Sequence, residues 1–110
     1  MKVGKELVAA SAAALVLGIL RRGPSYGYAI LSQVRELSGG ELEWSEGMLY
    51  PVLHRMEDQD LIESYLETAE SGRERKYYRL RAEGRRALAE EKKQWAVVHA
   101  TLSKAWAGKG

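Results

Sequence analysis

Two stretches decide the fold of this chain: Gly23-Pro24-Ser25-Tyr26-Gly27-Tyr28, which opens one predicted helix, and Gly47-Met48-Leu49-Tyr50-Pro51-Val52-Leu53-His54-Arg55-Met56-Glu57, which fills another. Two further stretches, Leu61-Ile62-Glu63-Ser64 and Arg73-Glu74-Arg75-Lys76-Tyr77-Tyr78-Arg79-Leu80, have the composition of strands joined by a polar turn. Helix, helix and short basic hairpin follow one another in a winged helix-turn-helix, whose second helix can enter a DNA major groove. The sequence therefore predicts a mainly α fold with a small β-hairpin wing (α+β).

Around these stretches, the hydrophobic pattern predicts the remaining helices. An Ala- and Leu-rich first helix is expected over about residues 5–22, and Gly23-Pro24 end it. Ser25 is expected to cap a second helix that reaches about Leu37. Tyr26, near the start of that helix, is expected to face outward, and Tyr28 to face the core.

The third helix carries a proline. Ser45 is expected to cap it, and Pro51 should remove a backbone hydrogen bond, so that the helix starts late or loosely. Strands are expected at about 61–67 and 75–81, with one of Tyr77 and Tyr78 facing the core because side chains alternate along a strand.

The last helix, at about 82–107, has a heptad-like apolar seam. Its apolar residues recur at spacings of three, four and seven, although the charged Glu91 interrupts the seam. A long helix of this kind favours a partner helix, which predicts a homodimer. The expected interface residues are Leu88, Trp95, Val98, Leu102 and Trp106. We expect one compact unit with two parts, a DNA-binding domain over 1–81 and a dimerisation helix over 82–110.

Charge is unevenly distributed, although the net charge is only +2. Residues 41–70 hold nine acids and one base, Arg55, whereas residues 73–93 hold nine bases and four acids. Phosphate binding needs positive charge because counterion release supplies most non-specific affinity for DNA. The wing is therefore expected to attract DNA, while the third helix brings little positive charge of its own.

Other classes of protein find little support in the sequence. The chain has 110 residues, the length of one domain, and no cysteine, which is consistent with a reducing cytoplasm. The apolar run at 7–20 is too short to span a bilayer, so no membrane association is expected. No nucleophile-base pair, metal-ligand spacing or phosphate-binding glycine loop is recognisable, and His54 lies far from His99. We expect neither an enzyme nor a metal site or other cofactor.

The candidate DNA contacts lie on three elements. Tyr50 and His54 share a face of the third helix with Arg55 beside it, whereas the basic residues of the hairpin flank the wing turn. The alternatives are a half-buried Tyr50, an ordinary surface His54 and a solvated hairpin. The candidate contacts are Ser25, Tyr26, Ser45, Tyr50, His54, Arg55, Arg73, Arg75 and Lys76.

These stretches resemble the PadR-like family of bacterial transcriptional regulators. The resemblance covers roughly residues 7–102 and rests on Gly-Pro-Ser-Tyr-Gly-Tyr, Leu-Tyr-Pro-Val-Leu-His-Arg and Arg-Lys-Tyr-Tyr-Arg-Leu in this order. It implies a winged helix-turn-helix with a dimerisation helix, in the short form with one terminal helix, usually acting as a repressor that a ligand releases. Several positions depart from the family pattern. Met48 replaces a small hydroxyl residue, Asp60 a turn glycine, Arg81 a threonine that often caps the last helix, and Ala12 and Ala13 polar residues of the first helix.

The resemblance extends to multidrug-sensing members, in which a tryptophan from each subunit holds a flat aromatic ligand at the dimer interface. Trp95 falls at the matching place, and Leu7, Ala10 and Ala14 are candidates to line such a pocket. The alternative is that Trp95 serves only dimer packing and that the small residues allow close helix packing.

We therefore predict a ligand-responsive repressor that binds double-stranded DNA as a homodimer on a pseudo-palindromic operator, with a small aromatic inducer at the interface. The alternative is a winged-helix interaction or small-molecule-sensing module that has lost specific DNA binding. Weak binding with little salt dependence would distinguish the alternative.

Overall fold

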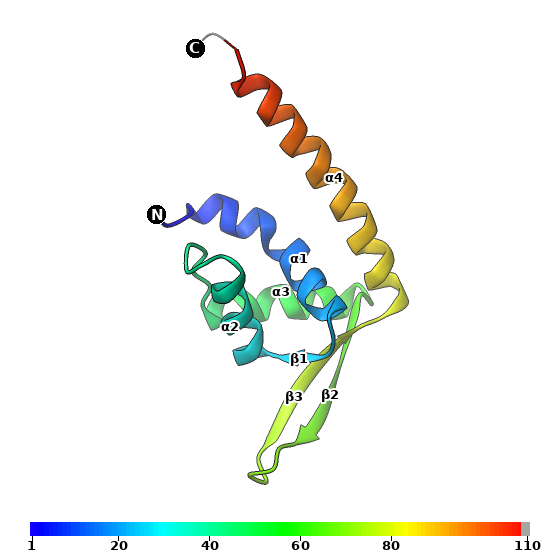
Figure 1. Ribbon diagram of the computed structural model, residues 1–110. Helices are drawn as coiled ribbons and strands as arrows, with labels where there is room; N and C mark the ends of the chain where they lie inside the picture. Colours follow the sequence, from blue (N-terminus) through cyan, green and yellow to red (C-terminus); the bar gives the residue numbers. More distant parts are fainter. Residues whose placement is uncertain (109–110) are drawn as a thin grey trace.

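A three-stranded antiparallel sheet, with the strand order β1-β3-β2, packs one of its faces against the helices. The computed structural model describes residues 1–108 and shows four helices around this sheet (Figure 1). The elements in chain order are α1 (Lys5–Arg21), β1 (Ser25–Tyr26), α2 (Gly27–Leu37), α3 (Glu46–Asp58), β2 (Ile62–Thr68), β3 (Glu74–Leu80) and α4 (Ala82–Trp106). The α+β architecture expected from the sequence is confirmed.

The short strand β1 is a correction to the sequence analysis, which expected only a hairpin. Ser25 pairs with Tyr78, and Tyr26 pairs with Tyr77. Because this pairing holds residues 25–26 in extended conformation, α2 begins only at Gly27, with Tyr26 at its N-cap position and no side-chain cap. The expectation that Ser25 caps α2 is therefore wrong.

Helix α3 begins as expected at its cap and runs through its proline without interruption. The backbone N–H of Met48 donates to Ser45 Oγ at 3.2 Å. The helix extends from Glu46 to Asp58 with Pro51 inside it, so the expectation of a late or loose start is wrong. Pro51 and Gly47 are both exposed, so the carbonyl that loses its hydrogen bond lies on the solvent side of the helix.

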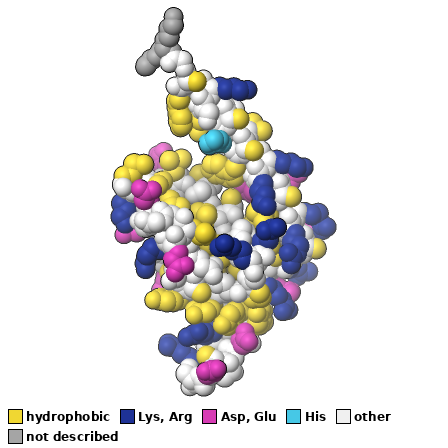
Figure 2. Space-filling view, viewed as in Figure 1, with side chains coloured by type: hydrophobic (Ala, Val, Ile, Leu, Met, Phe, Trp, Pro, Cys, Tyr) yellow, Lys and Arg dark blue, Asp and Glu magenta, His cyan; other side chains and the backbone are white. Residues whose placement is uncertain are grey.

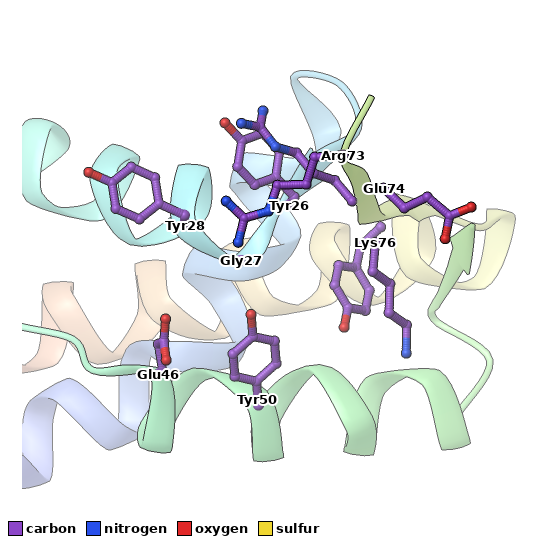
Figure 3. A pocket seen from close by; sticks show the side chains of 10 residues that line it. Tyr26, Gly27, Tyr28, Glu46, Tyr50, Arg73, Glu74 and Lys76 are labelled. Carbon is purple, nitrogen blue, oxygen red and sulfur yellow. The ribbon is translucent and has the colours of Figure 1, made fainter. Parts of the chain in front are cut away.

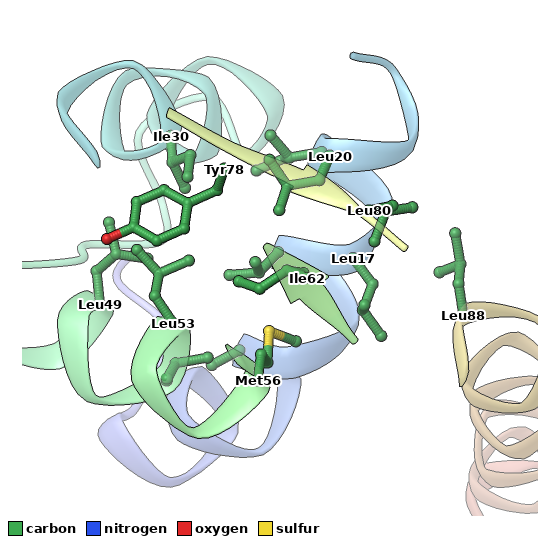
Figure 4. Packing of buried hydrophobic residues seen from close by; sticks show 14 of the residues in the cluster. Leu17, Leu20, Ile30, Leu49, Leu53, Met56, Ile62, Tyr78, Leu80 and Leu88 are labelled. Carbon is green, nitrogen blue, oxygen red and sulfur yellow. The ribbon is translucent and has the colours of Figure 1, made fainter. Parts of the chain in front are cut away.

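One core joins the sheet to all four helices (Figure 4). Tyr78 is only 1% exposed, which confirms that one of the two adjacent tyrosines faces the core. Around it lie buried aliphatic residues from each helix and from both long strands. They include Leu17, Leu20, Ile30, Leu49, Leu53, Met56, Ile62, Leu80 and Leu88. The helix-turn-helix pair and the base of the wing therefore share one set of packing contacts.

The chain leaves α3 through a tight turn that also anchors α4. Asp60 has a φ of 59°, a left-handed conformation that the turn glycine it replaces would adopt more easily. The carbonyl of the next residue, Leu61, accepts a hydrogen bond from the Arg81 N–H at 2.9 Å. A Cβ at Gly84 would overlap this carbonyl oxygen and would lie 2.8 Å from Leu80 Cδ2. The first turn of α4 can therefore approach the turn after α3 only because residue 84 is glycine.

Helix α4 first packs against α1, and its far end then extends away from the rest of the fold (Figure 1). Leu88 is buried, whereas the residues from 96 to 106 are all exposed, and the molecule extends over 61 × 31 × 21 Å. Among the described residues, no helix is long and apolar enough to cross a membrane.

We predict that Gly84→Ala lowers the free energy of unfolding by about 1–3 kcal/mol, because the added methyl group forces α4 away from the Leu61 carbonyl. Urea unfolding followed by circular dichroism measures this change. The control is Gly47→Ala in α3, where the new Cβ meets only Ser45 Oγ at 3.8 Å. That variant should be as stable as the wild type or more stable by up to about 1 kcal/mol. Equal stability of the two variants would contradict the prediction.

Candidate nucleic-acid interface

A cleft of about 580 Å³ opens between the start of α2, the first turns of α3 and the outer part of the wing (Figure 3). Its lining consists of tyrosines, charged side chains and one glycine: Tyr26, Gly27, Tyr28, Glu46, Tyr50, Arg73, Glu74, Arg75, Lys76 and Tyr78. Five candidate contacts from the sequence thus lie in one cleft. Tyr28 is 70% exposed here, so the expectation that it faces the core is wrong.

The angle between α2 and α3 is fixed by a contact between Gly27 and Tyr50. A Cβ at residue 27 would overlap the Tyr50 hydroxyl oxygen. The Tyr50 side chain is half-buried, so it packs the two helices together and also lines the cleft. The alternative that Tyr50 is half-buried is therefore correct, although Tyr50 also lines the cleft.

The other candidates on and before α3 have different surroundings. His54 is exposed on the outer face of the helix. Arg55 lines a separate cleft of about 260 Å³ that faces α4, so it does not share the cleft at the wing. Ser45 Oγ already accepts the capping hydrogen bond. Ser25 is 4% exposed and does not line the cleft, so a direct phosphate contact from its side chain does not fit the structure.

The three bases of the wing turn are not equivalent. Lys76 Nζ lies 4.0 Å from Glu57 Oε1 of α3 and 5.6 Å from the centre of the Tyr78 ring. The guanidinium of Arg75 lies over the Tyr26 ring, 4.6 Å from its centre, and Arg73 is exposed at the turn. Within residues 1–108, neither arginine lies within ion-pair distance of a carboxylate. Arg73 and Arg75 therefore supply the positive charge that is still available in the cleft.

Ion pairs neutralise part of the acidic segment at 41–70, which reaches into the first strand of the wing. Glu63 lies 2.8 Å from Arg79 Nε and 3.9 Å from Arg81 Nη1, and the hydrogen bond from Arg79 lowers the pKa of the Glu63 carboxyl. Glu57 accepts a hydrogen bond from Ser64 Oγ at 2.9 Å in addition to its contact with Lys76. Figure 2 shows the resulting mixture of basic and acidic side chains around the wing. The acidic count in the sequence thus overstates the negative charge that DNA would meet.

A second surface involves Trp95 and the exposed part of α4. The Trp95 Nε1–H donates to Glu91 Oε2 at 3.1 Å, so the charged residue of the apolar seam is paired with the indole. A shallow cleft of about 280 Å³ beside it brings Ala10 and Val98 next to Trp95. Of the other two expected lining residues, Leu7 is 62% exposed, and neither it nor Ala14 lines this cleft.

The sequence analysis missed several residues of this interface. Gly27 and Glu46 line the cleft without having been singled out, and Tyr28 lines it although it was expected in the core. Tyr65 and Tyr77 stack beside it on the outer face of the sheet. Tyr28 lies about 200° around α2 from the buried Ile30, so helical periodicity alone could have placed it on the surface. The stacking, in contrast, follows only from strand register.

Comparison with known proteins gives the same picture. Residues 16–90 match the model of the transcriptional regulator PadR-like family. A PadR family transcriptional regulator from Eggerthella lenta has a similar crystal structure, with a TM-score of 0.81 and 34% identity over 94% of this chain and 88% of that chain. A transcriptional regulator from Clostridium thermocellum has a TM-score of 0.87 and 25% identity over 96% and 99% of the two chains. An uncharacterised protein from Lysinibacillus sphaericus is 29% identical over 87% of this chain and 88% of its own length.

We predict that the stability of the protein falls as the pH rises from about 10 to about 12. Burial, helped by the nearby Glu57 and Tyr50, raises the pKa of Tyr78 from 10.0 to about 12. The unfolded chain therefore loses this proton first, and the stabilisation present below pH 10 is lost as the pH rises through the folded-state pKa. Urea unfolding at several alkaline pH values should show a weaker pH dependence in Tyr78→Phe. Tyr28→Phe, which removes an exposed hydroxyl, should keep the wild-type dependence; identical curves for both variants would refute the assignment.

Proposed function

Because this chain belongs to the PadR-like family of transcriptional regulators, we propose that it is a ligand-responsive repressor that binds double-stranded DNA as a homodimer. The observation that carries the proposal is the cleft between α3 and the wing. It combines an exposed helix face with two arginines that lie in no ion pair within the described residues. A surface of this kind suits a polyanion whose grooves admit a helix.

In the proposed complex, α3 enters the major groove with the exposed His54 toward the base edges. Arg73 and Arg75 then lie at the flanking phosphates, which fix register and orientation but carry no sequence information directly. Lys76 contributes less to phosphate binding, because the carboxylate of Glu57 partly neutralises its charge. Specificity therefore comes mainly from α3 and affinity mainly from the wing.

The exposed end of α4 supports the homodimer. Val98, Leu102 and Trp106 are 44%, 39% and 76% exposed, although all three are apolar. A second copy packed along this end would bury them. A two-fold dimer would place two copies of α3 in successive major grooves of a pseudo-palindromic operator.

The half-buried Trp95 supports ligand binding at that interface. The cleft beside it is shallow in one protomer, and a second α4 packed against it would close the cleft over a flat aromatic molecule. Such a ligand would release DNA only if it bound more tightly to a different dimer arrangement. In that arrangement, the distance between the two α3 helices would not match the distance between successive major grooves.

The alternative is an interaction module that has kept the fold without specific DNA binding. It is favoured by the acidic side chains that remain on α3, Glu46 in the first turn and Asp58 in the last. Met48, where a hydroxyl residue would offer a phosphate contact, also favours it. The two functions differ in their salt dependence, which the next experiment measures.

We predict that Arg73→Ala combined with Lys76→Ala weakens binding to every DNA sequence and reduces the slope of log K against log[salt] by between about one and two. Fluorescence anisotropy would be measured on the DNA upstream of the protein's own gene and on scrambled DNA, at several salt concentrations. The matched control, Arg85→Ala with Lys92→Ala, removes the same charge from α4 and should keep the slope. Weak binding by the wild type, equal on both DNAs and insensitive to salt, would favour the interaction module.

We predict that Val98→Glu combined with Leu102→Glu converts a dimer into a folded monomer, because charged side chains oppose burial of this end of α4. Analytical ultracentrifugation measures the mass, and circular dichroism confirms that the helices persist. The control is Val97→Glu, which lies on a neighbouring face of α4 and is 66% exposed. A wild-type protein that sediments as a monomer at high concentration would exclude the proposed dimer.

A further inference from the structure

Three tyrosines form a row across the outer face of the sheet. Tyr77 of β3 is the register partner of Tyr26 in β1 and of Tyr65 in β2, so one side chain from each strand lies on the same line. The Tyr26 and Tyr77 rings meet edge to face, with centres 5.2 Å apart, and the Tyr65 and Tyr77 rings stack with centres 5.7 Å apart. The row links the residue before α2 to both strands of the wing.

Each end of the row carries a guanidinium. Arg75 lies over Tyr26 at 4.6 Å from the ring centre, and Arg79 lies over Tyr65 at 4.7 Å. The two arginines differ in their charge partners, because Arg79 Nε is 2.8 Å from Glu63 Oε1. Glu67 faces Arg75 across the ladder, but no ion pair joins them in the described part of the chain. The cation at the end of the row that borders the cleft is therefore the one left free.

We propose that the tyrosine row (Tyr26, Tyr77 and Tyr65) is a positioning device that holds the Arg75 guanidinium beside the first turn of α2, ready to bind a DNA phosphate. The inference rests on the proposed function. An arginine on a wing strand would otherwise have many rotamers to lose on binding. Contact with the Tyr26 ring restricts them in the free protein, which reduces the entropy that binding must remove.

The row also determines what Arg75 is positioned against. Tyr26 immediately precedes α2, and the next residue, Gly27, contacts Tyr50 of α3. The guanidinium is thereby fixed relative to the helix-turn-helix rather than to the tip of the wing. This assigns the Tyr26 ring, rather than its hydroxyl, as the part of that residue that matters for DNA affinity.

The first test uses the free protein. Ring currents should shift the Arg75 Hδ signals upfield in NMR spectra of the wild type. The shift should remain in Tyr26→Phe, which keeps the ring, and disappear in Tyr26→Leu. Unshifted Arg75 signals in the wild type would overturn the proposal without reference to DNA. Circular dichroism of each variant confirms that it is folded.

The second test is a double-mutant cycle on DNA affinity and its salt dependence. Tyr26→Leu should weaken binding by about two- to fivefold, the size of an exposed cation–π contact, without changing the salt slope. Arg75→Gln should reduce the slope by about one, and Tyr26→Leu should then have no further effect. The charge-matched control is Arg79→Gln, whose guanidinium is paired with Glu63 and which should keep the slope.

The remaining outcomes distinguish a failure of the positioning role from a failure of the proposed DNA-binding function. Tyr26→Phe should restore the affinity that Tyr26→Leu loses; if it binds as weakly as the leucine variant, the hydroxyl is the contact and the positioning role is wrong. Additive effects of Tyr26→Leu and Arg75→Gln would also refute it. If NMR shows the ring contact but the wild type has no salt-dependent affinity for DNA, the proposed function fails, and the role of the row fails with it.

Discussion

The pairing of β3 with strands on both of its sides is the constraint on which the rest of the structure depends. At Tyr78, β3 meets Ser25 of β1 on one side and Ser64 of β2 on the other, while the Tyr78 side chain fills the core between the helices. The first pairing fixes where α2 can begin, and the second fixes the base of the wing. Helix α4 follows one residue after β3 ends. A single central strand thus sets the relative positions of every element that contributes to the cleft.

Electrostatics in the cleft depend on which charges are paired rather than on the net charge. Acids of α3 and β2 provide partners for the bases of β3 and the residue after it, since Glu57 lies beside Lys76 and Glu63 beside Arg79 and Arg81. These exposed and half-buried pairs contribute little stability individually. They do, however, leave Arg75 as a cation that an aromatic ring, and not a carboxylate, holds in place. An arginine held in this way keeps its full charge for a phosphate, whereas a salt-bridged one would first have to lose its partner.

The sequence predicted the helices, the hairpin and half of the residues that line the cleft, and its failures have physical causes. The long elements carry strong periodicity, and the wing bases stand in a recognisable order. Strand β1 has only two residues, which is too few to show periodicity. In addition, serine is a residue type common at helix N-caps, so Ser25 resembled a cap. Tyr28 is exposed because it lies about 200° around α2 from the buried Ile30, so this failure concerns helical periodicity and not strand pairing. The tyrosine row depends on register between residues about fifty apart in the chain, which local patterns do not contain. Pro51 is tolerated because its helix face is exposed, a fact of packing rather than of sequence.

Helix α4 gives the fold a mechanical link between its two surfaces. Its first turn is held against the Leu61 carbonyl by the Arg81 N–H and by the absence of a side chain at Gly84. Leu61 lies directly after the turn that ends α3, so this contact joins the start of α4 to the helix that lines the cleft. The far end of the same helix carries Trp95 and the exposed apolar residues beyond it. If a second copy packs there, a ligand beside Trp95 can change the crossing angle between the two α4 helices. That change alone would alter the distance between the two α3 helices. Coupling between the proposed sites then requires no rearrangement inside either protomer, because the rigid element that joins them is already anchored at α3.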